Sequence, residues 1–240
     1  MDNASRRSDA RQRWLRRAER VSDDFGLVLL LVLLTYVLAS VVSNRGWGAV
    51  LLVISTCATS IVALTSAHAR PTAVRRALVV AGLATLLAVI SALFGGRHWL
   101  TAASALEIGL LFAAMGAVLR RVVTTATVSS RTILGALSVY AVLGILFTWL
   151  YGAIDRFEDG TFFGAATQER GTDFVFFSYT TLTTTGYGDL VPSGEVGRMV
   201  AGLEMMIGQV FLVTLVAGLV SLWRPGEGLR RRRSGPEAGQ

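Results

Sequence analysis

The sequence has no lysine, one cysteine and two histidines among its 240 residues. Cys57 lies in an apolar stretch, so neither a disulfide framework nor a thiolate cluster for a metal can form within one chain. His68 and His98 are isolated, whereas a metal site needs several convergent donors. No Ser/His/Asp constellation is present either. We therefore expect neither an enzyme nor an organic cofactor.

Charge is also scarce, because only 16% of the residues are charged and 52% are hydrophobic. That composition is too apolar for an ordinary soluble domain and favours a membrane protein. All 23 basic residues are arginine, a bias typical of GC-rich, prokaryotic genomes.

Six charge-poor intervals are long enough to cross a hydrocarbon core about 30 Å thick. They are residues 25–43, 46–69, 77–96, 98–119, 132–154 and 199–223. Two of them carry a single carboxylate each, Glu107 and Glu204. A seventh apolar interval, 174–188, is too short to cross and becomes polar in its second half. We predict an all-α membrane protein with six transmembrane helices and one re-entrant segment that enters the membrane and turns back.

The arginines give the orientation, because positive residues in short loops stay on the cytoplasmic side. With the N-terminus inside, 18 arginines are cytoplasmic, and only Arg45, Arg97, Arg156, Arg170 and Arg198 lie outside. We therefore expect a multi-pass plasma-membrane protein with both termini cytoplasmic and the re-entrant segment facing outward. The predicted divisions are a basic N-terminal segment (1–24), a four-helix domain (25–119), a linker (120–131), a second membrane domain (132–223) and a basic tail (224–240).

The re-entrant stretch reads FVFFSYTTLTTTGYGDLVP, residues 174–192. Irregular backbone at membrane depth is tolerated only where it is packed in protein or lines a water-filled path. Gly186 and Gly188 can adopt backbone angles closed to other residues, so successive carbonyls can point to one side and replace the hydration shell of a monovalent cation. One chain supplies one such loop, so a ring of carbonyls requires several copies, and a homotetramer is the natural closure.

The segment TTLTTTGYGDLVP resembles the pore signature of tetrameric potassium channels, and the following GRMVAGLEMMIGQVFLVTLVAGLV resembles their prokaryotic inner helix. The resemblance implies a pore domain over 132–223, with an outer helix, a pore helix, a selectivity filter and an inner helix. It also implies K⁺ ions held by carbonyls in the filter, with Tyr187 turned away from them against the pore helix. The implied ion-binding residues are Thr184, Thr185, Gly186, Tyr187 and Gly188.

Two departures from that signature stand out. Thr185 occupies a position where valine or isoleucine is commoner, and Phe176 and Phe177 replace tryptophans whose indole N–H can hold the aspartate after the filter. Phenylalanine has no donor. Asp189 must then find another partner, and Glu204 can brace the filter from behind, near pore-helix threonines such as Thr180. Bracing predicts that Glu204→Gln alters selectivity or inactivation. A protonated carboxyl simply packed between helices is the other interpretation, and both stay open.

The inner helix also suggests a gate. Gly208 falls where the family has its hinge, although a close-packing glycine fits equally well. Leu212, Val216 and Val220 follow near one face and can form an apolar constriction. Span four has no arginine between His98 and Leu119, so the ladder of a voltage sensor is missing, and we expect little or no voltage dependence.

The predicted function is passive, potassium-selective conduction. A non-selective monovalent cation channel and a potassium transporter subunit are the alternatives. The expected partners are further copies of the chain and membrane lipid, with anionic lipid at the basic N-terminal segment. No nucleic-acid partner is expected.

Overall fold

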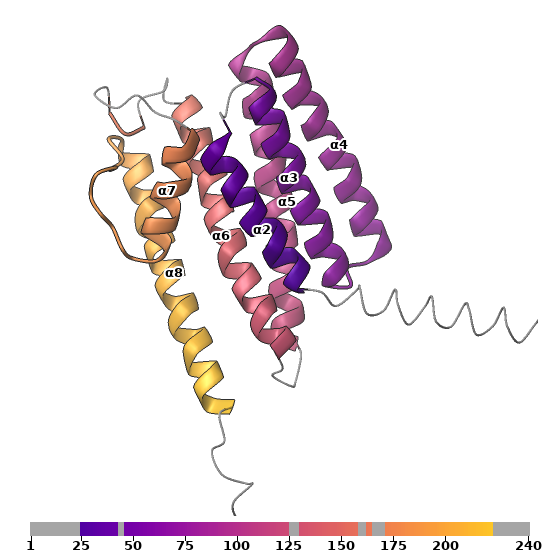
Figure 1. The fold of residues 1–240 in the computed structure, drawn as a ribbon, viewed down its shortest axis with the longest axis vertical. Helices are drawn as coiled ribbons and strands as arrows, with labels where there is room; N and C mark the ends of the chain where they lie inside the picture. Colours follow the sequence, from indigo (N-terminus) through magenta and orange to yellow (C-terminus); the bar gives the residue numbers. More distant parts are fainter. Residues whose placement is uncertain (1–24, 43–45, 125–129, 158–161, 165–170, 223–240) are drawn as a thin grey trace, which may run out of the picture.

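The computed structural model describes residues 25–42, 46–124, 130–157, 162–164 and 171–222, which form seven α-helices and no strand (Figure 1). The predicted basic N-terminal segment and C-terminal tail lie outside these residues, as do residues 125–129 of the linker. The helices are α2 (Phe25–Val41), α3 (Trp47–Ser66), α4 (Pro71–Phe94), α5 (Arg97–Thr124), α6 (Ser130–Phe157), α7 (Gly171–Leu182) and α8 (Glu195–Leu222).

Five of these helices, α3, α4, α5, α6 and α8, are long and apolar enough to cross a membrane. An all-helical protein with five such helices agrees with a membrane protein. The first predicted span corresponds to α2, which has 17 residues in the described part and extends about 26 Å at 1.5 Å per residue. It is apolar but shorter than the other five, so the count of six spans stays a prediction.

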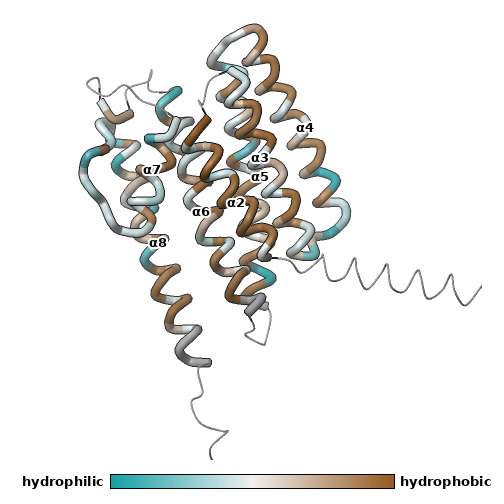
Figure 2. Tube along the Cα trace, viewed as in Figure 1, coloured by the Kyte–Doolittle hydropathy of each residue, from teal (hydrophilic) through white to brown (hydrophobic). Residues whose placement is uncertain are grey.

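A stripe of alanines lets α4 pack closely on its neighbours. Ala77, Ala81, Ala84 and Ala88 are buried at alternating spacings of four and three residues, the period of one helix face. Small side chains at such a face allow helix backbones to approach each other in a membrane. The opposite face exposes large apolar side chains such as Val79 and Leu86, which are suited to lipid. Figure 2 shows that the bodies of the long helices are largely hydrophobic, with hydrophilic residues mostly towards their ends.

Helix α2 joins the first helices to the last ones. It packs against α3, α6 and α7, and its buried residues again recur at alternating spacings of three and four. Thr35 Oγ1 lies 2.7 Å from Ser55 Oγ on α3, while Ser138 Oγ on α6 donates to the carbonyl of Phe25 at 3.0 Å. The first predicted span thus contacts the second membrane domain within one chain.

Helices α6, α7 and α8 form the layer that carries the re-entrant stretch (Figure 1). Helix α7 has 12 residues and extends about 18 Å, which is too short to cross. It lies at the end of the bundle where α6 ends and α8 begins. Residues 183–194 return from α7 to the start of α8 without helical structure, so the polar stretch lies beside α8 rather than at its far end.

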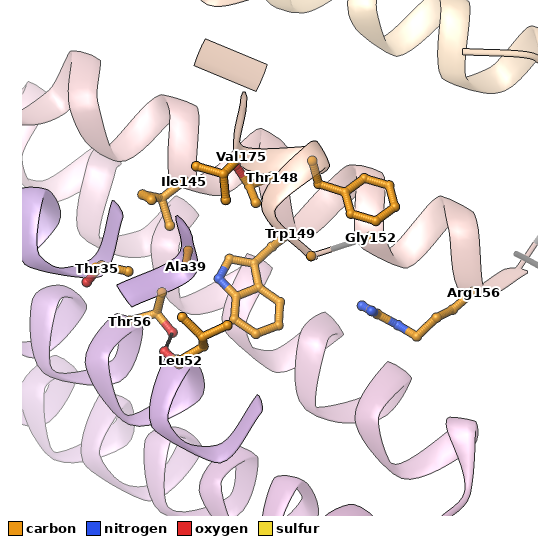
Figure 3. A pocket seen from close by; sticks show the side chains of 12 residues that line it. Thr35, Ala39, Leu52, Thr56, Ile145, Thr148, Trp149, Gly152, Arg156 and Val175 are labelled. Atoms are coloured by element: carbon orange, nitrogen blue, oxygen red, sulfur yellow. Dashed lines mark hydrogen bonds between the residues drawn. The ribbon is translucent and has the colours of Figure 1, made fainter. Parts of the chain in front are cut away.

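A small cavity lies between α2, α3, α6 and α7 (Figure 3). Its walls include the indole of Trp149 and the hydroxyls of Thr35, Thr56 and Thr148. The cavity volume is about 30 Å³, which is room for one water molecule. An organic ligand needs roughly ten times that volume. Arg156 lies at its edge, where Nη2 donates to Ser104 Oγ on α5 at 2.5 Å.

Gly144 allows α7 to approach α6. A Cβ atom there would lie 2.6–2.9 Å from the ring of Tyr179. That ring is fixed, because its hydroxyl donates to the carbonyl of Ala141 at 2.7 Å and its edge contacts Tyr36 at a centroid distance of 5.0 Å. The position therefore requires glycine, because the ring has no room to move.

We predict that Gly144→Ala lowers the free energy of unfolding by about 1–3 kcal/mol, as overpacking does. The measurement is the melting temperature of the purified protein in detergent. Gly109→Ala on α5 is the matched control, because no atom lies within 4 Å of its added Cβ. Equal melting temperatures for the two variants would contradict the close approach of α6 and α7.

Candidate functional site

The backbone after α7 alternates in handedness. Thr184, Gly186 and Gly188 have φ of +58°, +51° and +79°, whereas Thr185 and Tyr187 between them have negative φ. Alternation between left-handed and right-handed residues turns successive peptide groups so that N–H groups gather on one side and carbonyls on the other. Residues 184–188 show the alternation in the sign of φ that such an arrangement requires.

Thr184 is the unexpected member of this series. A β-branched residue at positive φ is a genuine outlier and costs on the order of 1–3 kcal/mol. The sequence predicts positive φ at the two glycines but carries no signal for it at Thr184, because threonine disfavours that region. Its N–H donates to the carbonyl of Thr181 at 2.9 Å, which helps to hold the strained conformation.

The end of α7 binds the loop through the main chain. The carbonyl of Thr180 accepts the N–H groups of Thr185 at 2.8 Å and of Gly186 at 3.2 Å. Thr183 adds a side-chain contact, since its Oγ1 lies 2.9 Å from Thr185 Oγ1 and donates to the carbonyl of Tyr179 at 2.7 Å. The N–H groups of Thr185 and Gly186 are thus hydrogen-bonded to the end of α7, and Thr180 takes part in this contact through its main-chain carbonyl.

The two phenylalanines of α7 have different neighbours. Phe176 stacks on the ring of Tyr187 with a centroid distance of 5.8 Å and an interplanar angle of 11°. Tyr187 remains 71% exposed. Phe177 is buried in an aromatic cluster with Tyr151 and Phe163, at 5.0 and 5.3 Å. Only Phe176 therefore stacks on the loop.

Asp189 is exposed, and its Oδ1 accepts the N–H of Leu190 at 3.0 Å. This local bond gives the aspartate a partner that does not depend on an aromatic donor.

Glu204 is fully buried and connects three helices. Its Oε1 lies 2.6 Å from Ser178 Oγ on α7, and its Oε2 lies 2.5 Å from the hydroxyl of Tyr151 on α6. Ser178 Oγ also lies 2.8 Å from the carbonyl of Gly144. The partner on α7 is a serine in the middle of the helix, one to two turns before the loop, and not one of the threonines at its end.

Gly208 is a packing position within continuous helix α8. A Cβ there would collide with the carbonyl oxygen of Leu182 at the end of α7. The same carbonyl accepts the hydroxyl of Tyr140 at 3.0 Å, and the ring of Tyr140 stacks on Phe211 at 5.6 Å. Of the three predicted gate residues, Leu212 and Val216 are exposed in the single chain, and the side chain of Val220 lies outside the described residues.

The other buried carboxylate, Glu107, lies in the first four helices. Its Oε1 accepts the thiol of Cys57 at 2.8 Å, and its Oε2 has no hydrogen-bond partner in the part of the chain that the structure describes. This pairing of Glu107 with Cys57 could not be predicted from the sequence, because neither residue belongs to a motif.

Tyr140, Tyr151 and Ser178 were missed from the sequence. The signal for the first two was their spacing, since residues 140, 144 and 151 repeat at intervals of four and seven and so share one face of a helix. That face of α6 carries a hydroxyl and a glycine towards α7 and a second hydroxyl towards Glu204 on α8. Ser178 had no distinguishing signal among the hydroxyl residues of 178–185.

Residues 136–224 match the model of a family described as ion channel. The chain is also similar to a cyclic nucleotide-gated potassium channel of Rhizobium etli, with 35% identity over 98 residues. That match covers 38% of this chain and 24% of the relative, so the chain spans about a quarter of the relative's length. No solved structure matches the chain significantly. These matches support an ion channel and a membrane protein rather than an enzyme.

We predict that Gly208→Ala lowers the free energy of unfolding by about 1–3 kcal/mol. The reason is that its methyl group overlaps the carbonyl oxygen of Leu182, a backbone atom that moves less easily than the end of a side chain. Melting temperature in detergent measures the effect, at about 2–4 °C for each kcal/mol. Gly202→Ala on the same helix is the control, because its added Cβ has no atom within 4 Å in the chain. A normal melting temperature together with impaired ion flux would instead indicate a hinge.

Proposed function

We propose that four copies of this chain form a potassium-selective channel for passive conduction. The observation that carries the proposal is the alternating φ of residues 184–188, with their N–H side bonded to α7. Carbonyls left on the opposite side are hard oxygen ligands without charge, which suit a partly dehydrated monovalent cation. In this proposal K⁺ is coordinated by carbonyls of Thr184, Thr185, Gly186 and Tyr187, with the hydroxyl of Thr184 at the inner end and Gly188 at the mouth.

A single chain supplies one column of carbonyls, so the site is incomplete without further copies. Two features support closure around an axis. The loop is exposed on the chain, including the ring of Tyr187, and α8 exposes large apolar residues on several faces. A homotetramer would cover both, and the remaining apolar surface would face lipid.

Selectivity for potassium over other monovalent cations is supported by the Gly-Tyr-Gly order of the loop and by the name of the Rhizobium relative. A non-selective monovalent cation channel is the nearest alternative. A potassium transporter subunit is the other, and it would carry several such loops in one chain. From the relative's name we propose only the ion, potassium, for this chain, and not regulation by a cyclic nucleotide.

The proposed pore narrows along α8. Leu212, Val216 and Val220 form an apolar gate below the filter, and Gly208 packs against α7 at the level of the filter's base. Asp189, Glu204, Phe176, Phe177 and Thr180 support the filter. The chain resides in the plasma membrane with both termini cytoplasmic, and its basic N-terminal segment lies on anionic lipid.

Purified protein in liposomes is expected to conduct K⁺ in preference to Na⁺ and to be blocked by Ba²⁺. Gly186→Ala should abolish or strongly reduce this flux, because its φ of +51° is unfavourable for alanine even though no atom lies within 4 Å of the added Cβ. Gly82→Ala on α4, also in open space, is the matched control. Equal K⁺ and Na⁺ flux would favour the non-selective alternative, and no flux under any condition would contradict the channel.

We also expect the open probability to change little with membrane potential. Each charge moved through the field contributes about 2.3 kcal/mol per 100 mV, and α5 has no arginine between His98 and Leu119. Steady currents recorded in a planar bilayer between −100 and +100 mV test this point. Steep opening over a few tens of millivolts would contradict it.

A further inference from the structure

The contacts around Glu204 indicate how many hydrogens the carboxyl group and its partners need. Three oxygen–oxygen contacts meet there: Tyr151 hydroxyl to Oε2 at 2.5 Å, Ser178 Oγ to Oε1 at 2.6 Å, and Ser178 Oγ to the Gly144 carbonyl at 2.8 Å. All three contacts are full hydrogen bonds only if each has its own hydrogen; otherwise Ser178 has to share its one hydroxyl hydrogen between two acceptors. A carbonyl has none to give.

An ionised Glu204 leaves this set one hydrogen short. Tyr151 and Ser178 each carry one hydroxyl hydrogen, which makes two hydrogens for three contacts. A protonated Glu204 supplies the third. Tyr151 then donates to Oε2, Oε1 donates to Ser178, and Ser178 donates to the carbonyl of Gly144, so every contact is a hydrogen bond.

The surroundings also favour the neutral acid. Glu204 is fully buried, and among the described residues no cationic side chain is hydrogen-bonded to it. A buried carboxylate without a cation costs several kcal/mol in a medium of low dielectric constant. Such a group avoids that cost by binding a proton.

We infer that Glu204 is a protonated carboxylic acid that donates a hydrogen bond to Ser178, and that Tyr151 and Ser178 are positioning residues of the pore helix. The chain Tyr151–Glu204–Ser178–Gly144 closes a ring of contacts between α6, α8 and α7. It fixes α7, whose carbonyl at Thr180 in turn holds the loop. The inference deepens the proposed function, because it names what orients the filter.

This assignment agrees with one of the two interpretations that the sequence left open, the protonated carboxyl. The other, a bracing Glu204, predicts that Glu204→Gln alters selectivity or inactivation. As a neutral acid it can be replaced by glutamine, whose amide oxygen accepts from Tyr151 and whose NH₂ donates to Ser178.

Infrared spectroscopy of the purified protein tests the proton directly. Wild type at neutral pH is expected to show a carbonyl stretch of a protonated carboxylic acid, shifted in D₂O, that is absent from Glu204→Gln. Glu107→Gln, which removes the other fully buried carboxylate, should leave that band in place. The inference is overturned if Glu204→Gln removes only carboxylate bands or changes no carboxyl band.

A second readout separates the roles of the side chains. Glu204→Gln is expected to keep the wild-type melting temperature. Glu204→Ala and Ser178→Ala should each melt lower, by about 2–4 °C for every lost hydrogen bond. A Gln variant that melts as low as the Ala variant would contradict the inference. The infrared spectrum can be recorded whether or not the protein conducts ions. Absent K⁺ flux in the wild type would therefore contradict the proposed channel, whereas an absent carboxylic-acid band would contradict this inference.

Discussion

The carbonyl of Thr180 accepts two N–H groups from the loop that follows α7, and the local structure depends on this interaction. Backbone groups at membrane depth must be satisfied within the protein or by a water-filled path. Since the N–H groups of Thr185 and Gly186 are used by Thr180, the carbonyls on the other side of the alternating backbone remain available. In the proposed channel, these carbonyls are the oxygen ligands of the ion.

The position of that helix depends in turn on side chains that meet in the protein interior. Gly144 lets Tyr179 approach α6, Gly208 lets the end of α7 approach α8, and Glu204 joins α6 and α8 to Ser178. Two of these three features are glycines that remove volume, and the third is a polar network of a carboxyl group and two hydroxyl groups. Such a network is specific, because a partly satisfied one would be unfavourable in the membrane.

The helical class, the long apolar helices and the loop with its two glycines followed from the sequence, because hydropathy and glycine have direct physical meanings. The positive φ of Thr184 did not, since tertiary structure imposes it against the residue's preference. The hydrogen-bond partners of Glu204 and Glu107 could not be predicted from the sequence either. A single sequence shows that a membrane carboxyl needs a partner, but helix packing decides whether the partner is a tyrosine, a serine or, for Glu107, the thiol of Cys57. The contact of α2 with α6 and α7 likewise follows from packing alone.

In the proposed channel, the carbonyls of residues 184–187 coordinate monovalent cations on an axis shared by four chains. An experimental structure of the assembled protein with Rb⁺ or Tl⁺, which replace K⁺ and scatter anomalously, tests this coordination. We expect a fourfold assembly with a row of anomalous peaks on its axis, between the carbonyls of these residues. An assembly without that symmetry, or a fourfold axis with no ion between the loops, would contradict it.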